Sequence, residues 1–284
     1  MADIMRVAAI QMHSSDIKAD NVEQALALIA RAANYGATLV ALPEVWTYLG
    51  DTAGVAGVAD DIPGPLTERL AEAARRHGIY LHCGSIYERV AGEPRAFNTT
   101  VVLDPDGDIM ARYRKIHLFD VNIGGNVAFT ESETIAPGHE TVVVDLGGVK
   151  LGLAICYDLR FPELFRMLAL DGAELIAMPA AFTQFTGKDH WEVLLRARAI
   201  ENQVFMLAPN EHGRHPGGSV TYGRSMIVDP WGTVLATAPD GPGVVVADCD
   251  LNTLARIRRE VPSLANRQPD AYRERWVSEA AAVN

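Results

Sequence analysis

The chain has 284 residues, 49% of them hydrophobic and 21% charged, so it can bury a sizeable core, and neither a disordered nor a fibrous protein is expected. Its 25 Lys and Arg residues are outnumbered by 36 Asp and Glu residues, which gives a net charge of −11 and makes nucleic acid and membrane surfaces poor partners. No apolar run is long enough to span a membrane, and no basic, apolar leader opens the chain. Three cysteines without a Cys-x-x-Cys pair indicate a reducing compartment. We therefore expect a soluble, cytoplasmic protein.

Helix and strand patterns alternate along the first third of the chain. Apolar runs at 6–11 and 38–42 flank a segment whose apolar residues recur at helix spacing, and Asp20 can cap the start of that helix. A second helix is predicted to begin at Pro65, since proline is favoured at the first helical position. It leads into another apolar strand at 79–84.

Two matching hairpins are predicted at 100–111 and 226–236, because Pro at the second turn position and Gly at the fourth suit a type I turn followed by a bulge. Apolar strands that alternate with amphipathic helices predict an α/β fold with covered sheets, and the hairpins make these sheets mixed. The simplest organisation is a single domain over 1–284, with a C-terminal tail from about 262. Between the hairpins we expect strands at 151–156, 174–178 and 204–208 and helices at 162–170 and 188–202.

Two reactive side chains stand where apolar strands end. Cys156 closes the run 151–156, ahead of a polar segment that cannot continue the strand. Its thiol is predicted at a strand-to-helix turn, where backbone N–H groups can hold an oxyanion and favour the thiolate. Glu44 follows the strand 38–42 in the same way, either as a solvated charge or as a site residue. Taken alone, Cys156 is better explained by core packing, and Lys115 by a solvated surface.

Three motifs in order change this interpretation: Leu-Pro-Glu at 42–44, Arg-Lys-Ile-His-Leu at 114–118 and Cys-Tyr-Asp-Leu-Arg-Phe-Pro-Glu at 156–163. With them the chain resembles the carbon–nitrogen hydrolase family, also called the nitrilase superfamily, from about residue 5 to about 272. The resemblance implies a four-layer α-β-β-α sandwich that pairs through its helices into dimers. It also implies four roles: Glu44 as general base, Lys115 as oxyanion stabiliser, Cys156 as nucleophile and Glu131 as a further catalytic glutamate.

The chemistry agrees with these residue types. A free thiol has a pKa of about 8.5 and needs a base or a cation nearby, and Lys115 supplies the cation. A glutamate with a pKa near 4.3 is about four units too acidic to take the thiol proton, a mismatch of about 6 kcal/mol. Burial and the second carboxylate of Glu131 are expected to raise the pKa of Glu44. Glu44 can then protonate the leaving ammonia and activate water.

Within the family the chain looks most like the branch that acts on deaminated glutathione. Cys-Tyr-Asp differs from the Cys-Trp-Glu typical of true nitrilases, which favours an amide substrate over a nitrile. The alternatives are an omega-amidase, an aliphatic amidase or nitrilase, and, from another class, a non-catalytic binding or signalling member. The amide is expected to carry a carboxylate that Arg160 holds, unless Arg160 pairs with Asp158 or Glu163 as scaffold. Further substrate-binding residues are expected to be Tyr157, Phe182 and Thr186.

No cofactor and no metal are expected. The segment 190–192 contains the His-x-Glu of zinc deaminases, but the downstream Pro-Cys-x-x-Cys is missing. His212 and His215 have no third ligand near them in sequence. The expected partners are the amide substrate and further copies of the chain, as a homodimer or a higher homo-oligomer, with no nucleic acid and no membrane.

Overall fold

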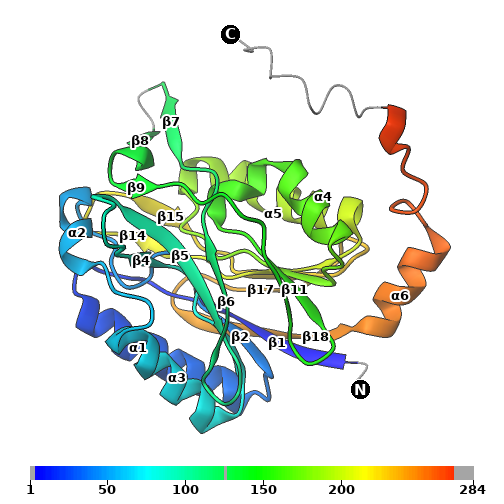
Figure 1. The fold of residues 1–284 in the computed structure, drawn as a ribbon, viewed down its shortest axis with the longest axis horizontal. Helices are drawn as coiled ribbons and strands as arrows, with labels where there is room; N and C mark the ends of the chain where they lie inside the picture. The colour runs from blue at the N-terminus through cyan, green and yellow to red at the C-terminus, as the bar shows by residue number, and fades with distance from the viewer. Residues whose placement is uncertain (1–3, 125–126, 272–284) are drawn as a thin grey trace.

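The computed structural model describes residues 4–124 and 127–271. Two mixed β-sheets lie face to face, and helices cover the outer side of each (Figure 1). This arrangement confirms the predicted α/β fold, a four-layer α-β-β-α sandwich with mixed sheets. The C-terminal tail expected from about 262 extends beyond the described residues into 272–284.

The first sheet has eight strands in the order β18-β1-β2-β3-β5-β4, with β6 and β9 paired to β5. Its central strands β1, β2 and β3 run parallel because helices connect them, and β18, β4 and β6 are added antiparallel to their neighbours. The elements are β1 (Ile4–Gln11), α1 (Lys18–Asn34), β2 (Leu39–Ala41), α3 (Pro65–His77), β3 (Tyr80–His82), β4 (Ile86–Glu88), β5 (Ala96–Leu103), β6 (Ile109–Arg114), β9 (Ile135–Ala136) and β18 (Gly243–Asp250).

The second sheet has six strands in the order β10-β11-β12-β13-β16-β17. Its strands β11, β12 and β13 are parallel, and the other three pair antiparallel. Its elements are β10 (Val143–Asp145), β11 (Lys150–Leu153), α4 (Pro162–Leu170), β12 (Leu175–Ala177), α5 (Gln184–Asn202), β13 (Phe205–Ala208), β16 (Met226–Val228) and β17 (Val234–Thr237). Smaller elements are α2 (Val55–Val58), β7 (Asp120–Ile123), β8 (Val127–Thr130), β14 (His212–Arg214), β15 (Val220–Tyr222) and α6 (Leu251–Glu260).

Side-chain alternation along β1 explains how the layers pack. Ala8 and Ile10 belong to the core that the first sheet shares with α1 and α3, whereas Val7 and Ala9 belong to the core between the two sheets. Successive strand residues point to opposite faces, so a strand covered on both sides must be apolar throughout. Residues 7–10 of β1 and all of β2 have this composition, so the first sheet can be covered by helices on one face and by the second sheet on the other.

Both predicted hairpins are present, one in each sheet. The strands β5 and β6 pair antiparallel, as do β16 and β17, and each pair has a register shift next to its turn. Gly107 and Gly232 occupy the fourth turn positions with φ of 83° and 86°, a conformation that glycine adopts without steric cost.

Some local predictions were wrong. Asp20 does not cap the first helix, because α1 begins at Lys18 and Asp20 lies in its first turn. The helix expected at 188–202 begins at Gln184. Neither β18 nor α6 is among the elements predicted from the sequence. In the described part of the chain, no helix is long and apolar enough to cross a membrane.

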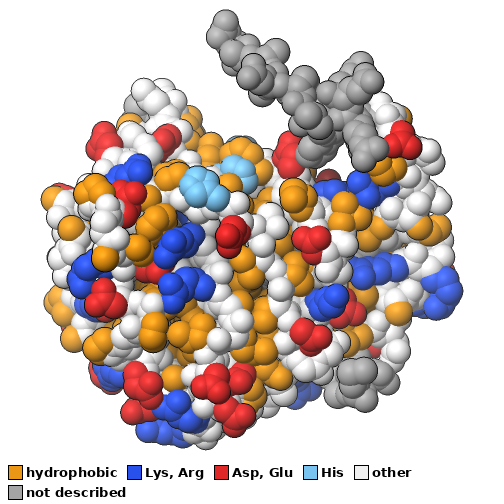
Figure 2. All heavy atoms as spheres, in the orientation of Figure 1, with side chains coloured by type: hydrophobic (Ala, Val, Ile, Leu, Met, Phe, Trp, Pro, Cys, Tyr) orange, Lys and Arg blue, Asp and Glu red, His pale blue; other side chains and the backbone are white. Residues whose placement is uncertain are grey.

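The surface agrees with the charge balance. Figure 2 shows acidic and basic side chains interspersed on the face drawn, with apolar side chains between them. A single-sign basic field is the electrostatic signature expected of a nucleic-acid-binding surface. This face does not have one.

Candidate active site

The four residues with expected catalytic roles come together at strand ends. Glu44 follows β2 of the first sheet, Lys115 follows β6, and Cys156 begins a short 3-10 helix, Cys156–Arg160, just after β11 of the second sheet. Glu131 begins another 3-10 turn after β8. The site therefore forms where the carboxyl ends of strands from both sheets meet, the usual ligand position in α/β proteins.

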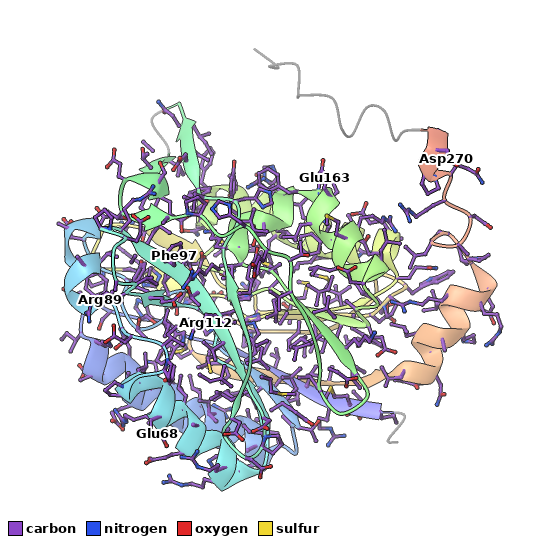
Figure 3. The ribbon with its side chains drawn as sticks, in the orientation of Figure 1. Glu68, Arg89, Phe97, Arg112, Glu163 and Asp270 are labelled. Atoms are coloured by element: carbon purple, nitrogen blue, oxygen red, sulfur yellow. The ribbon has the colours of Figure 1, made fainter. Side chains whose placement is uncertain are left out.

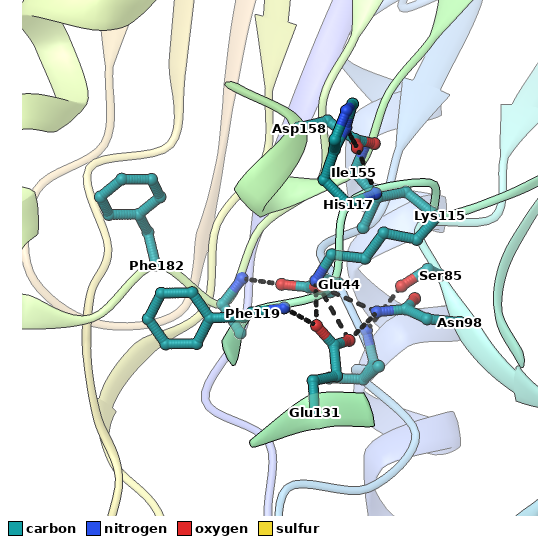
Figure 4. A network of polar contacts seen from close by, with 12 residues as sticks. Glu44, Ser85, Asn98, Lys115, His117, Phe119, Glu131, Ile155, Asp158 and Phe182 are labelled. Atoms are coloured by element: carbon teal, nitrogen blue, oxygen red, sulfur yellow. Dashed lines mark hydrogen bonds and ion pairs between the residues drawn. The ribbon is translucent and has the colours of Figure 1, made fainter. Parts of the chain in front are cut away.

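Lys115 lies between the two glutamates (Figure 4). Its Nζ donates to Oε1 of Glu44 at 2.9 Å, and to Oε2 and Oε1 of Glu131 at 2.8 and 3.1 Å. The side chain of Asn98 also donates to both glutamates, at 2.9 and 3.2 Å. All four side chains are buried, so these charged contacts are shielded from water and are strong.

The Glu44 carboxylate also interacts with the backbone and with the nucleophile candidate. Oε2 accepts a hydrogen bond from the backbone N–H of Ala181 at 2.8 Å, and the Cys156 thiol hydrogen-bonds to the same carboxylate. Cys156 has a φ of 47°, which is unusual for a residue with a side chain and is typical of strain at functional sites. Its backbone N–H is tied to the carbonyl of Pro179 at 2.9 Å, so the neighbouring strand end supports this conformation.

The loop that carries Glu44 packs tightly against the first sheet. A Cβ added to Gly84 would lie 2.0 Å from the carbonyl oxygen of Pro43, and Gly84 also has a φ of 63°. Both facts require glycine there. The backbone N–H of Val45 donates to Oγ of Ser85 at 3.0 Å, so the residues on either side of Glu44 are held by the turn after β3.

The predicted rise in the pKa of Glu44 is wrong. Burial does raise its pKa, but the Lys115 charge and the hydrogen bonds from Cys156, Lys115 and Ala181 outweigh burial, and the net pKa is lowered from 4.5. Glu44 is therefore ionised at neutral pH. The prediction did not account for the number of hydrogen-bond donors that contact this carboxylate.

The thiol and the lysine have raised pKa values. Burial and the nearby Glu44 charge raise the pKa of Cys156 well above 9.0, although Lys115 opposes them. Burial lowers the pKa of Lys115, but Glu131 and Glu44 outweigh it and leave the pKa well above 10.5. The resting site thus holds a neutral thiol: Lys115 and a backbone hydrogen bond from Ala181 do favour the thiolate, but burial and Glu44 outweigh them. An ionised Glu44 and a protonated Lys115 stand ready around that thiol.

A cavity of about 900 Å³ opens onto this cluster and is lined by all four expected substrate-binding residues. The guanidinium of Arg160 lies over the ring of Phe182, 5.3 Å from its centre, and 5.9 Å from the centre of the Tyr157 ring. Thr186 lines the same cavity and shares a hydrogen bond with Thr183 at 2.8 Å.

The scaffold alternative for Arg160 finds no support in the contacts. Asp158 accepts hydrogen bonds from Tyr113, His117 and the backbone N–H of Ile155, and Glu163 points away from the sandwich (Figure 3). Within the described residues, Arg160 makes no ion pair with either acid. Its one side-chain hydrogen bond there is to Nδ1 of His190 at 3.2 Å.

Comparison with known proteins places the chain in a family. The model of the carbon–nitrogen hydrolase family matches residues 6–259. The chain belongs to the carbon–nitrogen hydrolase family. It is 41% identical to mouse (Mus musculus) omega-amidase NIT2 over 267 residues, which cover 94% of this chain and 96% of that protein.

Solved structures agree with this family assignment. The C. elegans NitFhit protein superposes with a TM-score of 0.87 at 36% identity, over 95% of this chain and 66% of that longer chain. An amidase from Nesterenkonia sp. AN1, at 27% identity and a TM-score of 0.80, covers 95% of this chain and 96% of that chain. A mutant of that amidase carries the acetamide moiety of fluoroacetamide covalently on its active-site cysteine.

These relatives bear on the sequence-based predictions. The predicted family and the predicted enzyme class, a carbon–nitrogen hydrolase of the amidase type, are confirmed. The preference for a deaminated glutathione amidase is not supported, because the relatives compared are named omega-amidases, which was the alternative. In the part of the chain that is described, no group of three or more His, Cys, Asp or Glu side chains could hold a metal ion.

Sequence reasoning missed some residues of this carbon–nitrogen hydrolase site. Asn98 was missed because no sequence motif marks an asparagine inside a strand as a site residue. Asp158 lies inside the cysteine motif but was considered only as a partner of Arg160. It joins the segment before Lys115 to the segment of Cys156, through Tyr113 at 2.6 Å and Ile155 at 2.8 Å. Neither motif indicates this contact, because it joins segments that are about 45 residues apart in the sequence.

Proposed function

We propose that this chain is an omega-amidase: it hydrolyses the terminal amide of a small, carboxylate-bearing amide through an acyl-enzyme on Cys156 and releases ammonia. The observation that carries the proposal is the buried cluster of Glu44, Lys115, Glu131 and Cys156 at the end of a cavity that also contains Arg160. The omega-amidase relatives, at about 41% identity over most of the chain, support the substrate class.

The geometry supports a two-step mechanism. In the first step the Cys156 thiol gives its proton to Glu44 and its sulfur attacks the amide carbon, while Lys115 stabilises the oxygen that becomes negative. Glu44 returns the proton to the leaving nitrogen, so the C–N bond breaks and ammonia departs. In the second step Glu44 takes a proton from water, which attacks the thioester, and the carboxylic acid and the thiol are released.

Glu131 acts through Lys115 in this proposal. It accepts two contacts from the ammonium and a third hydrogen bond from the backbone N–H of Phe119 at 2.7 Å. Because a buried ammonium needs a counter-charge when Glu44 becomes protonated, Glu131 keeps Lys115 charged and in place during the proton transfer.

Arg160 defines the far end of the substrate. Its guanidinium is packed over two aromatic rings but has no acidic partner among the described residues, so it is available for a substrate carboxylate. A non-catalytic binding role for the protein is disfavoured, because binding alone does not need a thiol aimed at a buried carboxylate–lysine pair.

A substrate panel tests the function. We expect ammonia release from a five-carbon 2-oxo acid with a terminal amide, with a higher kcat/KM than from a neutral amide of equal length, from deaminated glutathione or from a nitrile. Arg160→Lys should lower kcat/KM about 10- to 100-fold for the carboxylate-bearing amide, because a charged hydrogen-bonded contact is lost.

The neutral amide and a second variant are the controls for this panel. Arg160→Lys should leave the neutral amide nearly unaffected, and Arg196→Lys, at an exposed arginine of α5, should leave both substrates unaffected. Equal losses for the two amides in Arg160→Lys would assign Arg160 to the scaffold and remove the argument for an acid-bearing substrate.

We further propose that the chain forms a homodimer through the outer face of α4 and α5, and that residues 1–284 form one domain. Large apolar side chains are exposed on this face, and contiguous exposed apolar surface marks an interaction site. Arg196 donates to the carbonyl of Gly232, so Trp231 lies beside α5. The exposed residues of the face are Met167, Leu170, Val193, Ile200 and Trp231.

A further inference from the structure

Asn98 contacts both acidic side chains of the site, yet the mechanism above gives it no part. Its Nδ2 donates one hydrogen bond to Oε1 of Glu44 at 2.9 Å and another to Oε1 of Glu131 at 3.2 Å. Its side chain lies beside the two carboxylates in Figure 4 and comes from β5. It is 1% exposed and does not line the substrate cavity. Asn98 therefore acts on the carboxylates and not on the substrate.

The Asn98 amide has one workable orientation. Its Oδ1 is buried and has no hydrogen-bond partner among the described residues, which is unfavourable for a polar atom. Rotating the amide by half a turn would place Oδ1 against two carboxylate oxygens. Their mutual repulsion is less favourable than one unpaired acceptor. The position thus leaves one acceptor unpaired in order to direct both N–H groups at the glutamates.

The local charge explains why two neutral donors matter. Lys115 is the one cation that contacts the two glutamates in the described part of the chain, so two carboxylates share a single ammonium in a buried place where unbalanced charge interacts strongly. Among the residues that the structure describes, the other titratable groups that interact electrostatically with the two glutamates are not cations. They are the Cys156 thiol, the Tyr87 phenol and the Glu211 carboxyl group.

We propose that Asn98 is a positioning residue: its two N–H groups hold Glu44 and Glu131 side by side on one lysine, so that the Glu44 carboxylate stays next to the Cys156 thiol. This rests on the proposed function, in which Glu44 takes the thiol proton. With a donor removed, the negative charge beside the thiol is less balanced, so Glu44 stays protonated up to a higher pH and a thiolate next to the ionised Glu44 is less stable.

Two variants test the proposal. Asn98→Asp puts a third carboxylate where the amide stood, and Asn98→Ser keeps one shorter donor. The first readout is the rate at which iodoacetamide alkylates Cys156 between pH 6 and 10, followed by mass spectrometry of its peptide. We expect the rate at pH 7 to fall about tenfold or more in Asn98→Asp and less in Asn98→Ser, because each unit added to the thiol pKa removes about tenfold of the thiolate.

The second readout separates positioning from binding. With the carboxylate-bearing amide, kcat should fall in both variants and the acid limb of the kcat profile should move to higher pH. KM should stay within about twofold, because Asn98 does not line the cavity. A rise in KM as large as the expected fall in kcat, with kcat itself unchanged, would overturn the proposal.

Thr100→Val is the matched control. Thr100 lies on the same face of β5, two residues further on, and its hydroxyl contacts His82 at 3.1 Å and not the carboxylates. This variant should lower the melting temperature and leave the alkylation profile unchanged. If both Asn98 variants behave like Thr100→Val, Asn98 is only structural and the proposal fails.

The alkylation readout also separates this proposal from the proposed function. It needs no substrate, so a wild-type protein that hydrolyses no omega-amide would refute the function while the alkylation profile still decides the role of Asn98. If Asn98→Asp does not fold, Asn98→Ser decides it alone, because a wild-type profile in that variant contradicts the proposal.

Discussion

At the scale of single residues, the site pairs a neutral thiol with an ionised carboxylate. The pKa of Cys156 is raised by burial and by Glu44, whereas the pKa of Glu44 is lowered by Lys115 and by hydrogen bonds. Proton transfer between them is therefore unfavourable in the empty site. In the proposed mechanism this transfer occurs when substrate is bound, because attack on the amide carbon consumes the thiolate as it forms.

Substitution of the residues proposed to be catalytic gives a direct prediction at this scale. Glu44→Gln and Lys115→Ala should each lower kcat by about 100- to 1000-fold, the usual loss when a proton acceptor or an oxyanion donor is removed. Cys156→Ala should abolish the acyl adduct that mass spectrometry detects on wild-type protein mixed with a slow substrate. Cys83→Ala is the control, since Cys83 is buried away from the cavity. Full activity in Cys156→Ala would exclude the thiol mechanism.

At the residue scale, the sequence predicts some features of the site and not others. The positions of Glu44 and Cys156 could be predicted, because a polar residue directly after a buried strand lies at the edge of a sheet. Their joint role required three motifs together. The contacts of Asn98 with residues 44 and 131 could not be predicted, because they arise from the pairing of distant segments. The direction of the Glu44 pKa was missed for the same reason, since its donors come from Lys115 and Ala181.

At the scale of elements, α5 illustrates what tertiary packing adds. Its first turn includes Thr186 and Gly187, which are poor helix formers, so the sequence pattern begins the helix too late. Packing explains the glycine: a Cβ at Gly187 would lie 2.5 Å from the Cβ of Tyr222 in β15. This close contact lets the start of α5 sit at the cavity, where Thr186 contributes to the lining.

At the scale of elements, we predict that a charge placed on the outer face of α5 weakens the proposed dimer. Val193 is 65% exposed and lies two helical turns before Ile200 on the same face. If α5 pairs with a second copy, Val193→Glu buries an unpaired charge there, which costs about 3–5 kcal/mol and should weaken the dimer about 100-fold or more. Light scattering after size-exclusion chromatography measures the change.

The control for the dimer prediction uses an exposed apolar residue elsewhere. Ile17, next to the start of α1, is 54% exposed, and Ile17→Glu should leave the molar mass unchanged. A wild-type protein that stays monomeric at micromolar concentration would contradict the proposed homodimer.

At the scale of the whole molecule, the two sheets are joined near the site by segments that follow β1 and β13. Met12 and Glu211 form a parallel bridge, and the backbone N–H of His212 donates to the carbonyl of Met12 at 2.8 Å. Glu211 also accepts hydrogen bonds from the backbone N–H and the hydroxyl of Ser14, at 3.0 and 2.8 Å. This carboxyl group is fully buried and makes no ion pair among the described residues.

Glu211 makes the stability of the whole fold depend on pH. Burial raises its pKa to about 8, whereas in the unfolded chain it returns to its ordinary value of 4.5. The folded protein therefore binds a proton here that the unfolded chain has lost between about pH 4.5 and pH 8. Its contribution to stability is fully present below pH 4.5 and is lost as the pH rises through about 8.

Glu211→Gln should remove this dependence, because the amide resembles the protonated acid in shape and carries no charge. We expect the melting temperature of the wild type to fall relative to Glu211→Gln between pH 5 and pH 9, as scanning calorimetry measures. The matched control is Glu23→Gln, at an exposed glutamate paired with Arg69, whose melting curve should run parallel to the wild type because surface ion pairs contribute little. If Glu211→Gln also ran parallel to the wild type, Glu211 would be ionised in the folded protein, with its charge stabilised by the two hydrogen bonds from Ser14.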